Sequence, residues 1–136
     1  MNRRRALQAA LIVTGLVALL LYPLMRYWPT GWAWSPGHGE YELMMVGIYA
    51  TLGVFLLLAS RNPEAHTSLI WFTVWSSVVH GGIMAIQALL DPTERGHLVG
   101  DVPALLLAAV ALGLLTPRGL SSMGSGSSSR PSDRSL

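Results

Sequence analysis

His80 stands near the middle of an apolar run, residues 73–91, which reads TVWSSVVHGGIMAIQALLD. A polar side chain in hydrocarbon is unfavourable unless it faces protein, water or a ligand, so an ionisable residue at this depth indicates a functional site. The structural alternative is a neutral imidazole that hydrogen-bonds to Tyr49, Gln87 or a serine and joins two helices. The sequence therefore offers His80 as the centre of a polar site or as a link between helices.

Two polar helix faces are expected to meet at His80. Helical periodicity places Gln87 on the same face as His80, and it places Glu42 and Tyr49 together on one face of the run 41–59. We expect both faces to point into the bundle, where Asp101, near the start of the run 98–115, could join them. We therefore predict a polar ligand-binding cavity bounded by Glu42, Tyr49, His80, Gln87 and Asp101.

A metal site is an alternative role for the outer polar residues. His97 and Asp101 are four residues apart, which places them one turn apart on a helix face, where imidazole and carboxylate could share an ion. The ligands that could complete such a site from the neighbouring loop are His38, Glu40 and Glu42. Neither a His-Glu-x-x-His motif nor a repeated Glu-x-x-His pair is present, so no zinc-protease or di-iron pattern supports it.

Haem ligation and catalysis have less support in the residue pattern. His80 is the one histidine expected deep in a span, so a haem would need Met45 or Met84 as its second axial ligand. No constellation of nucleophile, base and oxyanion donors is evident. We therefore expect no resident cofactor, with haem or a divalent metal kept as alternatives, and a protein that is more plausibly a binder than an enzyme.

The composition is that of an integral membrane protein. Of 136 residues, 51% are apolar and 12% are charged, and the mean hydropathy is +0.46. The nine basic residues are all arginines, scattered or gathered at the N-terminus, so no face is basic enough to bind nucleic acid. The absence of cysteine excludes disulfides, thiolate metal sites and thiol nucleophiles.

Four apolar runs come close to the length of about 20 residues that a helix needs to cross a bilayer. We predict an all-α fold, an integral membrane four-helix bundle over residues 1–117, with a disordered cytoplasmic tail over 118–136. Pro23 is expected to end the first run, and Asp91-Pro92 is expected to start a short interfacial helix. The approximate spans are 6–22, 41–59, 68–90 and 98–115.

The arginines also predict an orientation. Cytoplasmic segments carry the excess of basic residues, and only Arg26 and Arg95 fall outside if the N-terminus is cytoplasmic. Both termini are therefore expected in the cytoplasm, with the first span as an uncleaved anchor because no small-residue cleavage site follows it. The seven arginines placed inside are Arg3, Arg4, Arg5, Arg61, Arg118, Arg130 and Arg134.

Two stretches, GHGEYELMMVGIYATLGVFLLLASRNP and SLIWFTVWSSVVHGGIMAIQALLDPTERGHLVGDVPAL, resemble a family of small four-span bacterial membrane proteins of unknown function. The layout is also loosely similar to that of DoxX-like proteins. The resemblance covers roughly residues 38–117 and implies a location in the bacterial inner membrane. It implies no activity or ligand for His80, Glu42 or Asp101.

The favoured function is a non-enzymatic membrane protein, a binding or accessory subunit with an outward-facing polar cavity between the second, third and fourth spans. One alternative is a metal- or haem-binding redox protein that uses His80 or the His97/Asp101 pair. A further alternative is a proton-linked transporter, which would need an oligomer because one chain lacks repeated broken helices. Small residues offer faces for a homodimer or a membrane-protein partner: Gly81, Gly82, Ala104, Ala108 and Ala111.

Overall fold

The computed structural model describes residues 2–33 and 39–117, without the side chains of residues 39, 40 and 42. Every regular element within this part of the chain is helical, which confirms the predicted all-α class. The tail predicted over 118–136 lies outside the described residues.

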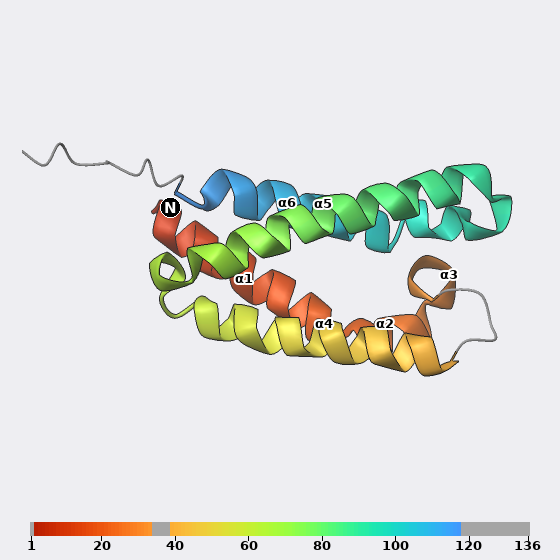
Figure 1. The fold of residues 1–136 in the computed structure, drawn as a ribbon, viewed down its shortest axis with the longest axis horizontal. Coiled ribbons are helices and arrows are strands. Elements are labelled where there is room, and N and C mark those ends of the chain that lie inside the picture. Colours follow the sequence, from red (N-terminus) through yellow and green to blue (C-terminus); the bar gives the residue numbers. More distant parts are fainter. Residues whose placement is uncertain (1, 34–38, 118–136) are drawn as a thin grey trace, which may run out of the picture.

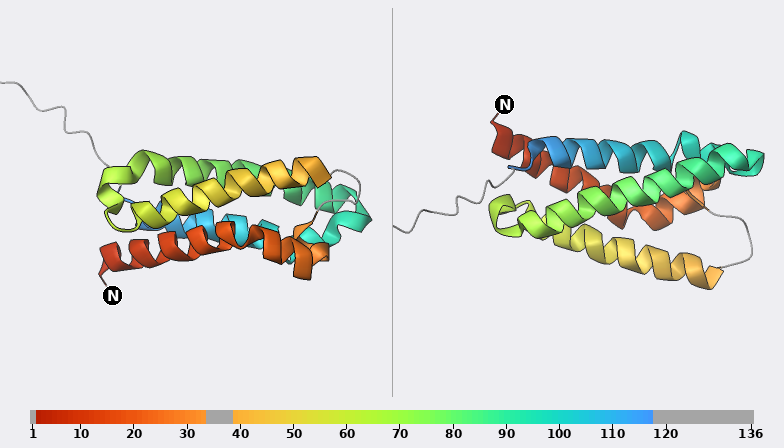
Figure 2. Two further views of the ribbon diagram at one scale, coloured as in Figure 1. Left: turned by 90° about the horizontal axis from the view of Figure 1, so that it is seen from below. Right: turned by 45° about the horizontal axis from the view of Figure 1, so that its top comes forward.

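Four long helices form two packed pairs. α1 (Arg3–Leu19) packs along α4 (Gly39–Ala59), and α5 (Thr67–Leu90) packs along α6 (Asp101–Leu115). α1 also contacts α6, because it crosses from the α5–α6 pair to the side of α4 (Figure 1). The two pairs approach each other at the end that carries the N-terminus and diverge toward α3, and Figure 2 shows the same arrangement from two further directions.

The end where the pairs approach holds the hydrophobic core. Its buried side chains come from the start of α1, the end of α4, the start of α5 and the end of α6. The close packing of these side chains stabilises this end of the bundle more than any single hydrogen bond does. The core residues are Leu7, Leu11, Leu56, Ile70, Val74, Ala109 and Leu112.

Arg3 joins the start of α1 to the end of α6 at the same end of the bundle. Its Nε atom donates to the carbonyl oxygen of Leu115 at 3.1 Å, and Nη2 donates to those of Thr116 and Leu114 at 3.1 and 3.2 Å. These are free carbonyls at the C-terminus of α6, where a cation also complements the helix dipole. The start of α1 and the end of α6 therefore lie side by side.

The first predicted span is broken where it was expected to be continuous. α1 ends at Leu19, and α2 (Leu21–Tyr27) continues at an angle of 55° to it. Pro23 lies inside α2 and does not end the helical segment, so that boundary prediction was wrong. The physical cause is local, since proline lacks the N–H and its ring crowds the carbonyl four residues earlier, which is that of Leu19.

Two short 3₁₀ helices join the long ones, η1 (Pro63–His66) before α5 and η2 (Pro92–Leu98) before α6. The predicted start at Asp91-Pro92 is confirmed, with a 3₁₀ helix at this place. Thr93 donates to the Asp91 carboxylate from its hydroxyl at 2.7 Å and from its backbone N–H at 2.9 Å, and these bonds lower the pKa of Asp91. A lowered pKa means that this cap stabilises the fold above the unfolded-state pKa and is lost as the pH falls through the folded-state value.

Two helical segments of the described chain are long and apolar enough to cross a membrane, and three are if the bent pair α1–α2 counts as one. These segments are Pro63–Leu90 and Pro92–Leu115. α4 contains a shorter apolar helical stretch, Leu43–Ala59, than these two segments. The outer faces agree with a membrane location because they expose large apolar side chains, including Phe72, Trp75, Ile86, Leu107 and Leu114.

Two glycines allow α1 and α4 to approach each other closely. Gly15 of α1 and Gly53 of α4 approach each other so closely that a Cβ atom on Gly53 would lie 2.7 Å from the carbonyl oxygen of Gly15. Gly81 packs against Leu105 and Leu106 of α6, and a Cβ atom on Gly82 would meet nothing within 4 Å. Small residues thus bring α1 against α4 within one chain.

Candidate functional site

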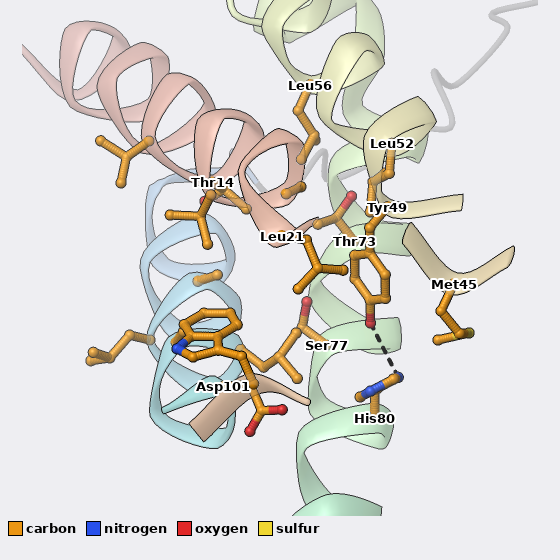
Figure 3. Close-up of a pocket in the computed structure, with 18 of the residues that line it drawn as sticks. Thr14, Leu21, Met45, Tyr49, Leu52, Leu56, Thr73, Ser77, His80 and Asp101 are labelled. Atoms are coloured by element: carbon orange, nitrogen blue, oxygen red, sulfur yellow. Dashed lines mark hydrogen bonds between the residues drawn. The ribbon is translucent and has the colours of Figure 1, made fainter. Parts of the chain in front are cut away.

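A cavity of about 620 Å³ lies between the two helix pairs (Figure 3). α1, α4, α5 and α6 all contribute to its wall, so α1 joins the three spans that were expected to enclose the site. The wall is also more apolar than predicted, because fifteen of its 23 residues are aliphatic residues or methionines. The remaining eight are Thr14, Trp32, Tyr41, Tyr49, Thr73, Ser77, His80 and Asp101.

His80 and Tyr49 contact each other at the wall of the cavity. The hydroxyl of Tyr49 and Nδ1 of His80 are 3.1 Å apart, which is a hydrogen bond between α4 and α5 (Figure 3). The two rings meet edge to face, with centroids 5.8 Å apart and an interplanar angle of 87°. His80 therefore has the interhelical partner that the structural alternative named, and it also lines the cavity.

A buried carboxylate, Asp101, lies at the same end of the cavity as His80 and Ser77 (Figure 3). Its Oδ2 atom is 2.9 Å from Nδ1 of His97, and Nε2 of His97 is 3.1 Å from Oε2 of Glu94. His97 is 2% exposed, although its position before the fourth apolar run had suggested an outer loop. The imidazole is thus held between two carboxyl groups, one of which faces the cavity.

Acidic groups outnumber basic ones in this cluster. Glu94 and Asp101 flank the single imidazole of His97, so two carboxyl groups and one imidazole lie together. The cluster therefore places an excess of acidic groups beside an apolar cavity.

Asp101 also has an oxygen atom without a partner. Its Oδ1 atom is buried and makes no hydrogen bond of good geometry with the described residues. Native proteins rarely bury polar atoms in this way, and each such atom calls for an explanation. Trp32 Nε1, a donor on another residue of the cavity wall, is likewise buried without a partner.

Backbone packing between α3 (Pro29–Trp32) and η2 fixes Trp32 beside this end of the cavity. A Cβ atom on Gly96 would overlap the carbonyl oxygen of Thr30, and one on Gly100 would overlap that of Gly31. Only glycine permits two backbones to approach so closely. These contacts place α3, which carries Trp32, against the segment that carries His97.

The predicted metal site gains no support from the described residues, which contain no group of three histidine, cysteine or acidic side chains that could hold an ion. The spacing of His97 and Asp101 serves a direct imidazole–carboxylate hydrogen bond instead. The candidates for completing the site, His38 and the side chains of Glu40 and Glu42, lie outside the described part of the chain.

Two of the five predicted cavity residues are not among its described lining. Gln87 is exposed and does not line the cavity, although it shares a helix face with His80. It lies seven residues farther along α5, about 10 Å at the rise of an α-helix, and a shared face does not fix how far a neighbouring helix extends. The side chain of Glu42 lies outside the described residues, so its predicted role stays a prediction.

The residues near the site that the sequence analysis did not assign to it include Thr14, Trp32, Tyr41 and Glu94. Thr14 is a polar residue within the first apolar run, which was a weak signal that this helix also faces the cavity. Trp32 had no signal beyond its aromatic character. Glu94 lies three residues before His97, a spacing typical of helical side-chain pairs, and this spacing was a signal that the two side chains could meet.

The comparisons with known proteins identify a family and no activity. The family model described as "Family of unknown function (DUF6632)" matches residues 2–135, and the chain therefore belongs to this family. No curated protein and no solved structure matches the chain.

Proposed function

We propose that this member of the DUF6632 family is a non-enzymatic integral membrane protein that binds a small amphipathic molecule. The observation that carries the proposal is the cavity itself, a largely apolar space of about 620 Å³ with a buried carboxylate at one end. Small-molecule sites in proteins have volumes of about 300–1,000 Å³ and combine apolar walls with a few fixed polar groups. The cavity between the helix pairs matches that description.

The cavity reaches the outer faces of the bundle. Val13 of α1 and Leu107 of α6 belong to its wall and are 60% and 68% exposed, and on α4 the exposed residues Tyr41 and Met45 also line it. The surrounding exterior is apolar, so in a bilayer these openings face lipid. A ligand with an apolar body can thus enter from the membrane without first crossing water.

Filling the cavity tests the proposal. We expect Ala108→Phe to reduce the amount of any co-purifying small molecule at least tenfold, because Ala108 lines the cavity and a phenyl ring would occupy its space. Native mass spectrometry of gently extracted protein, followed by extraction and identification of the released molecule, measures the occupancy. Val110→Phe is the matched control on the same helix, since Val110 is 57% exposed and is not part of the wall. Equal occupancy in the two variants would contradict a ligand in this cavity.

We further propose that α1–α2, α4, α5 and α6 form four spans in a bacterial inner membrane, with both termini cytoplasmic. The arginine distribution supports this orientation. The contacts of Arg3, which place the start of α1 at the end of α6, support the location of both ends on the same side of the membrane.

Single cysteines test the orientation, because the chain has none of its own. Arg95→Cys, in η2, should react with a membrane-impermeant thiol reagent in intact cells, and Glu64→Cys, in η1, should react only after lysis. Both positions are exposed, so accessibility within the fold does not limit either reaction. Reaction of Glu64→Cys alone in intact cells would reverse the orientation.

A further inference from the structure

We propose that the ligand of this cavity is a lipophilic cation, an organic amine whose ammonium group donates a hydrogen bond to Asp101 and whose apolar body fills the rest of the space. This inference rests on the proposed binding function and specifies the chemical class of the ligand. Three properties of the polar end carry it: a buried acceptor, an excess of acidic groups and aromatic rings.

The first property is the free acceptor. Asp101 is 7% exposed and lines the cavity, and its Oδ1 atom makes no hydrogen bond of good geometry with the described residues. Its second oxygen is already bonded to His97, so the carboxylate is held in place and not free to turn toward another partner. A buried acceptor without a partner destabilises the fold, and a ligand N–H would remove that penalty.

The second property is an excess of acidic groups. Glu94 and Asp101 both lie against the single imidazole of His97. No arginine belongs to the described wall of the cavity, and the chain contains no lysine. The basic group of that wall is His80, whose Nδ1 is bonded to Tyr49. Negative charge in an apolar environment is unfavourable without a cation, which a bound ammonium group would supply.

The third property is the aromatic wall. Trp32, Tyr41 and Tyr49 line the cavity from α3 and α4. The faces of aromatic rings attract organic cations, most strongly where water is excluded. An anionic head group such as a phosphate would find the opposite conditions, because the carboxylate of Asp101 would repel it.

A matched pair of probes tests the class of ligand. 1-Naphthylmethylamine and 1-naphthylmethanol share one apolar body and differ in an ammonium or a hydroxyl group, so the ratio of their affinities isolates the charge. Binding is measured by calorimetry on the full chain in phosphatidylcholine nanodiscs. The wild-type protein should bind the amine at least tenfold more tightly than the alcohol. Asp101→Asn should reduce this ratio to about one while alcohol binding persists, and Glu64→Gln, at an exposed site in η1, should leave the ratio unchanged.

The outcomes separate the two proposals. Equal binding of both probes by the wild type, abolished for both by Ala108→Phe, would overturn the cation inference and leave the binding function standing. Binding of neither probe by the wild type would contradict both. The wild-type ratio decides the matter even if Asp101→Asn does not fold. If added phosphatidylethanolamine competes with 1-naphthylmethylamine for the site, the ammonium group of the natural ligand belongs to a lipid. If it does not compete, the ligand is a free amine. Both results agree with the proposed chemistry.

Discussion

Replacing His97 by leucine is expected to lower the free energy of unfolding by about 3–5 kcal/mol, the effect of breaking a buried ion pair from one side. His97 is buried between Glu94 and Asp101, and both of its ring nitrogens are within 3.1 Å of carboxylate oxygens. Leucine has a similar volume but no donor. Both acids would then lose this partner, and the one that faces the cavity would remain in an apolar environment.

The measurement is an unfolding titration with dodecyl sulfate, monitored by tryptophan fluorescence in mixed micelles. His66→Leu is the control, because it makes the same change at an exposed position in η1 and is expected to alter stability by less than about 0.5 kcal/mol. His97→Gln should fall between the two variants, since an amide can donate to one carboxylate at a time. Equal stability of His97→Leu and His66→Leu would mean that the imidazole does not hold the two acids.

The sequence predicted the helices well because their signals are local. Three of the four apolar runs correspond to one long helix each, and the first corresponds to the bent pair α1–α2. Asp91 and Pro92 mark the start of η2 through capping bonds between neighbouring residues. The pairing of Tyr49 with His80 was also accessible, because helical periodicity placed each residue on the polar face of its own helix. These predictions needed no knowledge of how the helices are arranged.

The features that the sequence did not predict depend on the arrangement of helices in space. The crossing of α1 between the two pairs brings Thr14 to the cavity, and nothing in the periodicity of the first run specifies a crossing. The burial of His97 depends on α3 packing over η2, which in turn requires Gly96 and Gly100 to lie against another backbone. Periodicity assigns a residue to a face, but tertiary contacts decide what covers that face.

The contact between α1 and α4 provides the second large expected effect. Gly53→Leu should lower the free energy of unfolding by about 3 kcal/mol, at the upper end of the range for overpacked interiors. Even its Cβ atom would lie 2.7 Å from the carbonyl oxygen of Gly15 and 2.9 Å from Cγ of Leu19. The first of these neighbours is backbone, so the strain cannot be relieved by a change of rotamer alone and the two helices must separate.

Gly47→Leu is the matched control, because Gly47 lies in the same helix and a Cβ atom there would meet nothing within 4 Å. This variant should be neutral or more stable by up to about 1 kcal/mol, since leucine favours a helix more than glycine does. The same unfolding titration compares the two. The Gly53 variant should also lose ligand occupancy, because α1 forms part of the cavity wall and would move with the separation. If both leucine variants were equally stable, α1 and α4 would not be in close contact in the membrane, and the cavity that depends on their packing would have to be enclosed in another way.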